Sequence, residues 1–111
     1  MLNFIVNTRS GKGLGGKNIA KIAKYCYKNN IDYTVYITSA PGHATTLAQN
    51  LVDQKADIIV AVGGDGTFHE VLNGITTFEN TRLGFIPSGR GNDFARGMGI
   101  PRDPIEALKV I

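Results

Sequence analysis

Short runs of strand-forming residues alternate with amphipathic stretches along the chain, and this alternation constrains the fold more than any other feature. The apolar and β-branched runs occupy residues 2–7, 33–38, 57–62 and 82–86. Between and after these runs, apolar side chains recur at helical spacing, which predicts amphipathic helices. The expected helices cover residues 17–30, 44–55, 67–76, 93–98 and 104–111.

Strands that alternate with helices form a parallel sheet through right-handed crossovers. The run at 57–62, with the sequence DIIVAV, is the most apolar and is expected in the middle of that sheet. We therefore predict an α/β fold, a Rossmann-like parallel sheet with flanking helices.

The composition agrees with one soluble globular domain. Hydrophobic residues make up 42% of the chain and charged residues 19%, which excludes a disordered tail. No apolar run approaches the roughly 18 residues that a membrane span needs, and the start of the chain lacks the features of a signal peptide. The single cysteine, Cys26, falls on an apolar helical stripe and is expected in the core. One cysteine cannot form an intrachain disulfide, which favours a reducing cytoplasm.

Glycine is the compositional outlier, because 14 of the 111 residues are glycine, nearly twice the usual share of about 7%. Most of them gather in three segments, 11–16, 63–66 and 89–99, and each segment follows an expected strand. The carboxyl ends of parallel strands meet at one edge of the sheet, where α/β proteins bind ligands. The glycine segments therefore predict a site at which the backbone approaches a ligand closely.

The first segment, residues 10–16 (SGKGLGG), is expected to form a glycine loop. It satisfies G-x-G-x-x-G, but the second strand does not end in the acidic residue that would hold a ribose. It also falls short of a P-loop, because Asn18 stands where Ser or Thr would hold Mg²⁺. A flexible connection remains open, as does a phosphate-contacting loop with Asn7, Ser10 and the N–H groups of 11–13 as donors.

The second segment, GGDGT at 63–67, lies between the most apolar strand and a predicted helix. Its glycines allow a phosphate or a ribose to approach the backbone, and the helix start offers free N–H groups. Thr67 is expected to cap that helix, with Glu70 completing a capping box. A carboxylate between glycines cannot be a core residue, so we expect Asp65 to hold a hydroxyl group or Mg²⁺.

The third segment, PSGRGND at 87–93, contains Arg90 between two glycines. Its side chain is either free to reach a phosphate or solvated in a turn, and Asn92 or Asp93 is expected to cap the next helix. His69 precedes a glutamate, but the second histidine of H-E-x-x-H is absent, which excludes a zinc protease site. His43 is expected to be a capping or solvated residue.

These segments together resemble the N-terminal catalytic domain of the diacylglycerol kinase family, specifically the bacterial soluble lipid kinases. GGDGT-x-x-E-V-x-N-G and P-x-G-x-G-N-D-F-A carry the resemblance, which runs from the first strand to about Pro101. GGDG alone is less specific, because NAD kinases and phosphofructokinases carry a similar motif. The sequence departs from the family's pattern at three positions. Thr8 stands where the family often has proline, His69 where it often has asparagine, and Arg90 where it has threonine.

The resemblance implies transfer of the γ-phosphoryl group of ATP to a lipid hydroxyl, such as that of diacylglycerol, with Mg²⁺ as cofactor. It implies that ATP binds in a cleft between this domain, residues 1–111, and a β-sandwich domain that is absent from this chain. The catalytic base is expected in that second domain, and Asp65 is the candidate Mg²⁺ ligand. Matched to the family's motifs, the expected nucleotide contacts are Asn7, Ser10, Gly11, Thr38, Gly63, Gly64, Asp65, Gly66 and Thr67, to which Arg90 is added as a phosphate contact.

The expected partners are ATP or ADP and a lipid at a membrane surface, with no nucleic acid. The protein is expected to be cytoplasmic, its net charge of +3 allows peripheral membrane association, and a homo-oligomer remains open. The apolar last helix, without a stop signal, leads us to expect the first part of a longer protein. The lipid acceptor stays open, as do two alternatives: an NAD kinase-like enzyme and a non-catalytic nucleotide-binding module.

Overall fold

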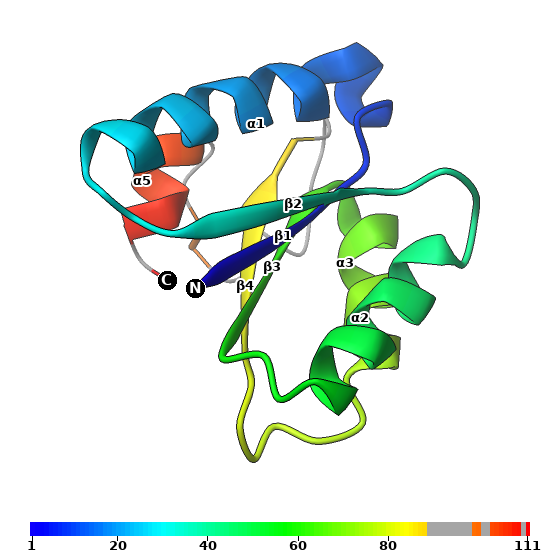
Figure 1. Ribbon diagram of the computed structural model, residues 1–111. Helices are drawn as coiled ribbons and strands as arrows, with labels where there is room; N and C mark the ends of the chain where they lie inside the picture. Colours follow the sequence, from blue (N-terminus) through cyan, green and yellow to red (C-terminus); the bar gives the residue numbers. More distant parts are fainter. Residues whose placement is uncertain (89–98, 101–102, 110) are drawn as a thin grey trace.

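The computed structural model describes residues 1–88, 99–100, 103–109 and 111 (Figure 1). The alternation of strands and helices is confirmed, whereas the helix expected at 93–98 and Arg90 lie outside the described residues. The elements are β1 (Leu2–Val6), α1 (Ser10–Lys28), β2 (Tyr33–Ile37), α2 (His43–Asp53), β3 (Ile58–Gly63), α3 (Asp65–Gly74), β4 (Arg82–Pro87) and α5 (Pro104–Lys109).

The four strands form one parallel sheet in the order β2-β1-β3-β4. The most apolar strand, β3, is central, as its composition predicts, and pairs with β1 and β4. Val6 is in register with both Ile37 and Val62, and Val62 is in register with Ile86. All four strands therefore end at nearly the same level. We call this carboxyl edge of the sheet the rim.

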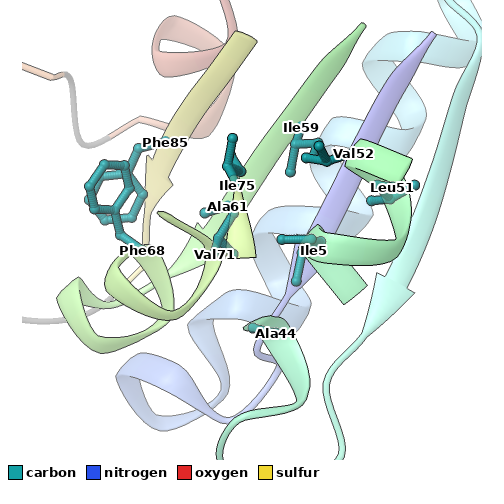
Figure 2. Close-up of a cluster of buried hydrophobic side chains, with 11 residues drawn as sticks. Ile5, Ala44, Leu51, Val52, Ile59, Ala61, Phe68, Val71, Ile75 and Phe85 are labelled. Atoms are coloured by element: carbon teal, nitrogen blue, oxygen red, sulfur yellow. The ribbon is translucent and has the colours of Figure 1, made fainter. Parts of the chain in front are cut away.

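The helices α2 and α3 cover one face of the sheet (Figure 1). Figure 2 shows the apolar layer between them, in which Ile5, Ile59 and Phe85 from the strands meet Leu51 and Val71 from the helices. Phe68 and Phe85 stack with ring centroids 4.8 Å apart, a separation typical of favourable aromatic pairs. This layer fixes the position of α3, and hence of its first turn at the rim.

The opposite face is covered by α1 and α5 (Figure 1). Residues that alternate along β1 point to opposite faces, so Phe4 and Val6 join this second layer while Ile5 joins the first. Cys26 is fully buried here, beside Ile22 of the same helix, which confirms its expected place in the core. Burial raises the pKa of its thiol.

The prediction that residues 10–16 form a loop is wrong, because α1 begins at Ser10. Glycine disfavours a helix interior by about 1 kcal/mol per residue, but tertiary packing of the later turns outweighs that cost. The buried stripe of Asn18, Ile22 and Cys26 holds α1 against the sheet. Gly13, with φ of 91°, adopts a conformation that other residues rarely take.

The predicted capping box at Thr67 and Glu70 is also wrong. The helix α3 begins at Asp65, two residues earlier, and its N-cap residue is Gly64, without any side-chain cap. The first helical hydrogen bond runs from the N–H of Phe68 to the carbonyl of Gly64, at 3.1 Å. Thr67 and Glu70 therefore lie inside the helix, and their side chains have other partners. Within the described part of the chain, no helix has the length and apolar character that crossing a bilayer requires.

Candidate functional site

A pocket of about 280 Å³ opens at the rim, beside the first turns of α2 and α3. It lies where the chain leaves β1 and β2, because these neighbouring strands end at the same level. The residues that line it are Asn7, Arg9, Thr38, Ser39, Ala40, Pro41, Ala44, Thr67 and Glu70.

Asn7, directly after β1, connects the strands with α3. Its backbone N–H donates to the carbonyl of Val62 at 2.9 Å. Its side-chain oxygen accepts the N–H of Arg9 at 3.0 Å, and its Nδ2 lies 3.5 Å from Oγ1 of Thr67. Asn7 therefore holds the turn after β1 and the pocket wall formed by α3 in a fixed relation.

The junction between β3 and α3 is close-packed. A Cβ added at Gly63 would lie 2.6 Å from Oγ1 of Thr67, so only glycine leaves room for that threonine. The carbonyl of Gly63 accepts the N–H of Ser88, which follows β4, at 2.8 Å. A Cβ at Gly66, by contrast, would meet no atom of the described residues within 4 Å. The backbone at Gly66 is therefore accessible to a ligand at the start of α3.

Asp65 is the first residue of α3. Its Oδ1 atom is buried and has no hydrogen-bond partner among the residues that the structure describes. Buried polar atoms almost always have partners, and exceptions call for an explanation such as a bound ion. Mg²⁺ is usually held by one or two carboxylates together with substrate phosphates, and no cluster of three or more acidic, histidine or cysteine side chains occurs among the described residues. A single carboxylate oxygen at the rim therefore fits a Mg²⁺ shared with phosphates.

Another part of the pocket wall is formed by Glu70 and the turn before α2. The Glu70 carboxylate accepts the N–H of Gly42 at 2.8 Å, and its carbonyl accepts the hydroxyl of Thr45 at 2.8 Å. Gly42 has φ of 84°, which favours glycine. Nδ1 of His43 accepts the N–H of Ser39 at 2.9 Å. These contacts connect α2 with α3 and shape the segment at 39–41 that lines the pocket.

The predicted nucleotide contacts divide into three groups. Asn7, Thr38 and Thr67 line the rim pocket. The end of β3 at Gly63, the N-cap residue Gly64 and the first residues of α3, Asp65 and Gly66, directly precede Thr67. Ser10 and Gly11 form the first turn of α1, which starts three residues after Asn7. Arg90 lies outside the described residues.

Sequence reasoning from the glycine loops missed Arg9 and the segment 39–41 as parts of the pocket. Arg9 is an exposed cation directly after β1, and that position alone could have indicated it. The segment 39–41 carries no glycine. Its place became apparent only with the strand order, which sets the end of β2 beside that of β1.

The family pattern described as the diacylglycerol kinase catalytic domain matches residues 1–111. The chain belongs to the diacylglycerol kinase catalytic-domain family. This catalytic domain is 38% identical over 103 residues to the protein named diacylglycerol kinase of Bacillus subtilis (strain 168), which covers 92% of the chain and 34% of that relative. It is 39% identical over 109 residues to the diacylglycerol kinase of Staphylococcus saprophyticus, which covers 97% of the chain and 36% of that relative.

Solved structures of diacylglycerol kinases have a fold similar to that of this chain. A crystal structure of a diacylglycerol kinase from Bacillus anthracis str. Sterne superposes on this chain with a TM-score of 0.82 at 35% identity. The match covers 98% of this chain and 40% of that one. The chain thus spans about a third of the length of its curated relatives.

Proposed function

We propose that this chain is the nucleotide-binding part of a lipid kinase that transfers the γ-phosphoryl group of ATP to a lipid hydroxyl, converting diacylglycerol to phosphatidic acid. The observation that carries the proposal is the buried Oδ1 of Asp65 at the start of α3, which has no partner within residues 1–88 or the other described segments. It lies in a turn next to a pocket whose lining includes Asn7, Thr38 and Thr67. Family membership over the whole chain supports this chemistry.

In this proposal the residues of the rim bind and orient the nucleotide. The hydroxyl and amide groups of Thr38, Thr67 and Asn7 offer hydrogen bonds to its polar groups, and the backbone at Gly66 leaves space for a phosphate. Phosphoryl transfer depends mostly on positioning and charge neutralisation. Asp65 is the residue that would hold Mg²⁺, which neutralises charge on the phosphates when it is bound.

The reaction breaks the bond between the γ-phosphorus and the oxygen that bridges it to ADP. It forms a bond between that phosphorus and the lipid oxygen, and the hydroxyl proton passes to a base. We assign no catalytic base among residues 1–111 and propose that the base lies in a second, β-sandwich domain of the whole kinase. The isolated chain is accordingly expected to bind nucleotide with little or no kinase activity.

Thermal unfolding of the chain with and without MgADP tests nucleotide binding. A ligand that binds only the folded state stabilises it by about 2.7 kcal/mol at ~100 times its dissociation constant, which raises Tm by at least several degrees in a domain of this size. We expect this rise with MgADP and none with NAD. A rise with NAD that equals or exceeds the rise with MgADP would favour an NAD kinase-like site instead.

A matched pair of threonine variants places the binding at the rim. Thr67→Val removes a hydroxyl that lines the pocket, whereas Thr46→Val removes one from an exposed position on α2. We expect Thr67→Val to lose most of the Tm rise with MgADP and Thr46→Val to retain it. Equal rises in the two variants would refute the assignment of Thr67.

A further inference from the structure

We propose that two copies of this chain associate through the outer edge of β2, so that the sheet continues from one copy into the other. The strand β2 stands at one end of the strand order and, among the described residues, pairs with β1 alone. Figure 1 is seen from this side, with β2 in front of the other three strands. The strand does not line the nucleotide pocket, and the inference does not depend on the proposed function.

The backbone of β2 presents hydrogen-bonding groups along this edge. The N–H of Thr38, directly after the strand, donates to the carbonyl of Val6 on β1 at 2.9 Å. The N–H and C=O of one residue point to the same side of a strand, and that side alternates from residue to residue. Even-numbered residues of β2 therefore bond to β1. The backbone groups of Tyr33, Val35 and Ile37 point outward, where no other described strand meets them.

The side chains of the same three residues are incompletely covered. They lie on the face of the sheet that α1 covers, because they are in register with the residues of β1 that include Phe4 and Val6 of the second core layer. At the edge this cover is thin, since Ile37 is 55% exposed and Tyr33 is 36% exposed. Large apolar side chains beside an open strand edge favour association with a further strand.

The two edge strands of the sheet differ in composition. The strand β4 has the sequence RLGFIP, and a charge and a proline are features by which edge strands avoid pairing with other chains. The strand β2 has the sequence YTVYI, which contains no charge, glycine or proline and consists of residues that favour strands. This contrast indicates that the edge of β2 is covered by another strand.

The sequence of β2 complements itself when two copies run antiparallel around Val35. A two-fold axis normal to the sheet then sets Val35 opposite its mate and Tyr33 opposite Ile37 of the second copy. These are the residues whose backbone groups point outward, so the pairing forms up to about six hydrogen bonds. Each pair of Tyr33 with Ile37 joins an aromatic to a β-branched side chain and covers the two most exposed residues of the strand. No charge opposes a like charge, which favours a second copy as the occupant.

The same register reaches the segment that lines the nucleotide pocket. Beyond Ile37, it sets Thr38 opposite Asp32 of the second copy. The next residue, Ser39, falls opposite Ile31 of that copy. Asp32 and Ile31 line a hollow of about 570 Å³ between the end of α1 and the start of β2, which leaves room for the segment. Because Thr38 and Ser39 line the rim pocket, association would hold one wall of that pocket in place.

Analytical ultracentrifugation of the chain over a range of concentrations tests the association. The interface is small, so we expect a reversible dimer with a dissociation constant in the micromolar range. The variant Tyr33→Lys, Ile37→Lys sets like charges opposite each other at both pairs and should raise the dissociation constant at least about tenfold. The variant Tyr33→Glu, Ile37→Glu should do the same, although it lowers the net charge of the chain instead of raising it.

The variant Tyr33→Lys, Ile37→Glu is the matched control, because the proposed register then sets each lysine opposite a glutamate. It should dimerise at least about tenfold more tightly than either like-charged variant, as should an equimolar mixture of the two. Equal dissociation constants for the control and the like-charged variants would overturn the proposal. A monomer at every concentration of the unaltered chain would also overturn it, and would leave the edge to another part of the whole kinase or to a different protein.

Thermal unfolding of the same preparations shows that the variants are folded and separates this inference from the proposed function. Both substituted positions are exposed, so all three variants should unfold cooperatively at similar temperatures. A Tm rise with MgADP in a chain that stays monomeric would overturn the association alone. A dimer that shows no response to MgADP would count against nucleotide binding and would leave the association standing.

Discussion

The two ends of the sheet treat their polar groups differently. At the amino end, buried polar side chains have partners within the protein: Asn3 donates to the carbonyl of Ile58 at 3.0 Å, and Thr81 donates to that of Ala56 at 2.6 Å. At the rim, Asp65 has a buried oxygen that finds no partner in the described part of the chain. Asn18, in the half of α1 nearer the rim, has a buried Nδ2 that is likewise without a partner among those residues.

This difference separates groups that stabilise the fold from groups available to a ligand. A buried polar atom without a partner costs about 1–3 kcal/mol, so native proteins keep few of them. At the amino end of the sheet, buried polar groups form hydrogen bonds within the protein and stabilise the fold. The rim carries the cost of an unsatisfied carboxylate, which a bound cation or donor would relieve.

The largest expected effect compares two glycines at opposite ends of α3. A Cβ at Gly74 would collide with the carbonyl oxygen of Thr45 and lie 2.8 Å from the Cβ of Ala48, whereas a Cβ at Gly66 would meet nothing within 4 Å. We expect Gly74→Ala to lower the free energy of unfolding by about 3 kcal/mol, because α2 must move. Gly66→Ala should leave it unchanged or raise it by up to about 1 kcal/mol. Urea denaturation measures both, and equal stabilities would contradict the packing described here.

The second prediction compares a satisfied polar group with an unsatisfied one. Thr81→Val leaves the carbonyl of Ala56 without its donor and should cost about 1–3 kcal/mol. Asp65→Asn should cost no more than about 1 kcal/mol, the usual contribution of an acidic residue in the first turn of a helix, and should abolish most of the stabilisation by MgADP. Asp53→Asn, at an exposed position of α2, is the control. An Asp65→Asn variant that keeps the full MgADP effect would contradict the role assigned to Asp65.

A third prediction concerns Cys26, which is buried near the end of α1 that lies at the amino end of the sheet. Its native thiol should react with iodoacetamide at least about tenfold more slowly than in the urea-unfolded chain. Burial raises the pKa of this thiol in the folded state. Its contribution to stability is therefore complete below the unfolded pKa of about 8.5 and is lost as the pH rises through the folded value. The free energy of unfolding of Cys26→Ala should depend less on pH in that alkaline range. Fast reaction of the native thiol with iodoacetamide would show that the amino end of the sheet is accessible to solvent.

The smallest expected effect concerns the ion pair at the amino end of the sheet. The N-terminal ammonium group lies 3.3 Å from Oδ2 of Asp57, and both side chains are more than half exposed. Exposed pairs contribute between 0 and about 1 kcal/mol, so Asp57→Asn should change the free energy of unfolding by less than about 0.5 kcal/mol. A larger loss of unfolding free energy in urea denaturation would mean that this surface ion pair stabilises the amino end of the sheet.

Much of this architecture could be predicted from residue patterns. Alternating strands and helices lead to a parallel sheet, and the composition of DIIVAV leads to its centre, because both depend on local sequence and general rules of chain connection. The gathering of Asn7 and the GGDGT turn at one edge follows from the same rules.

The remaining features depend on contacts between distant residues. The bond from Gly42 to Glu70 joins positions 28 residues apart, so a local pattern at Glu70 suggested a capping box instead. The start of α1 at Ser10 depends on packing that outweighs the propensity of its glycines. The unpartnered Oδ1 of Asp65 could be anticipated as a functional carboxylate, but its burial becomes visible only in three dimensions.

The most direct test of the difference between the two ends is a titration of ¹⁵N-labelled chain with MgADP, followed by the backbone amide signals in NMR spectra. We predict that the perturbed amides cluster at Asn7, Thr38 and residues 63–67, whereas those of Asn3, Ala56 and Thr81 stay unchanged. Perturbations centred on the amino end of the sheet, or none at saturating MgADP, would contradict the assignment of the rim as the nucleotide site.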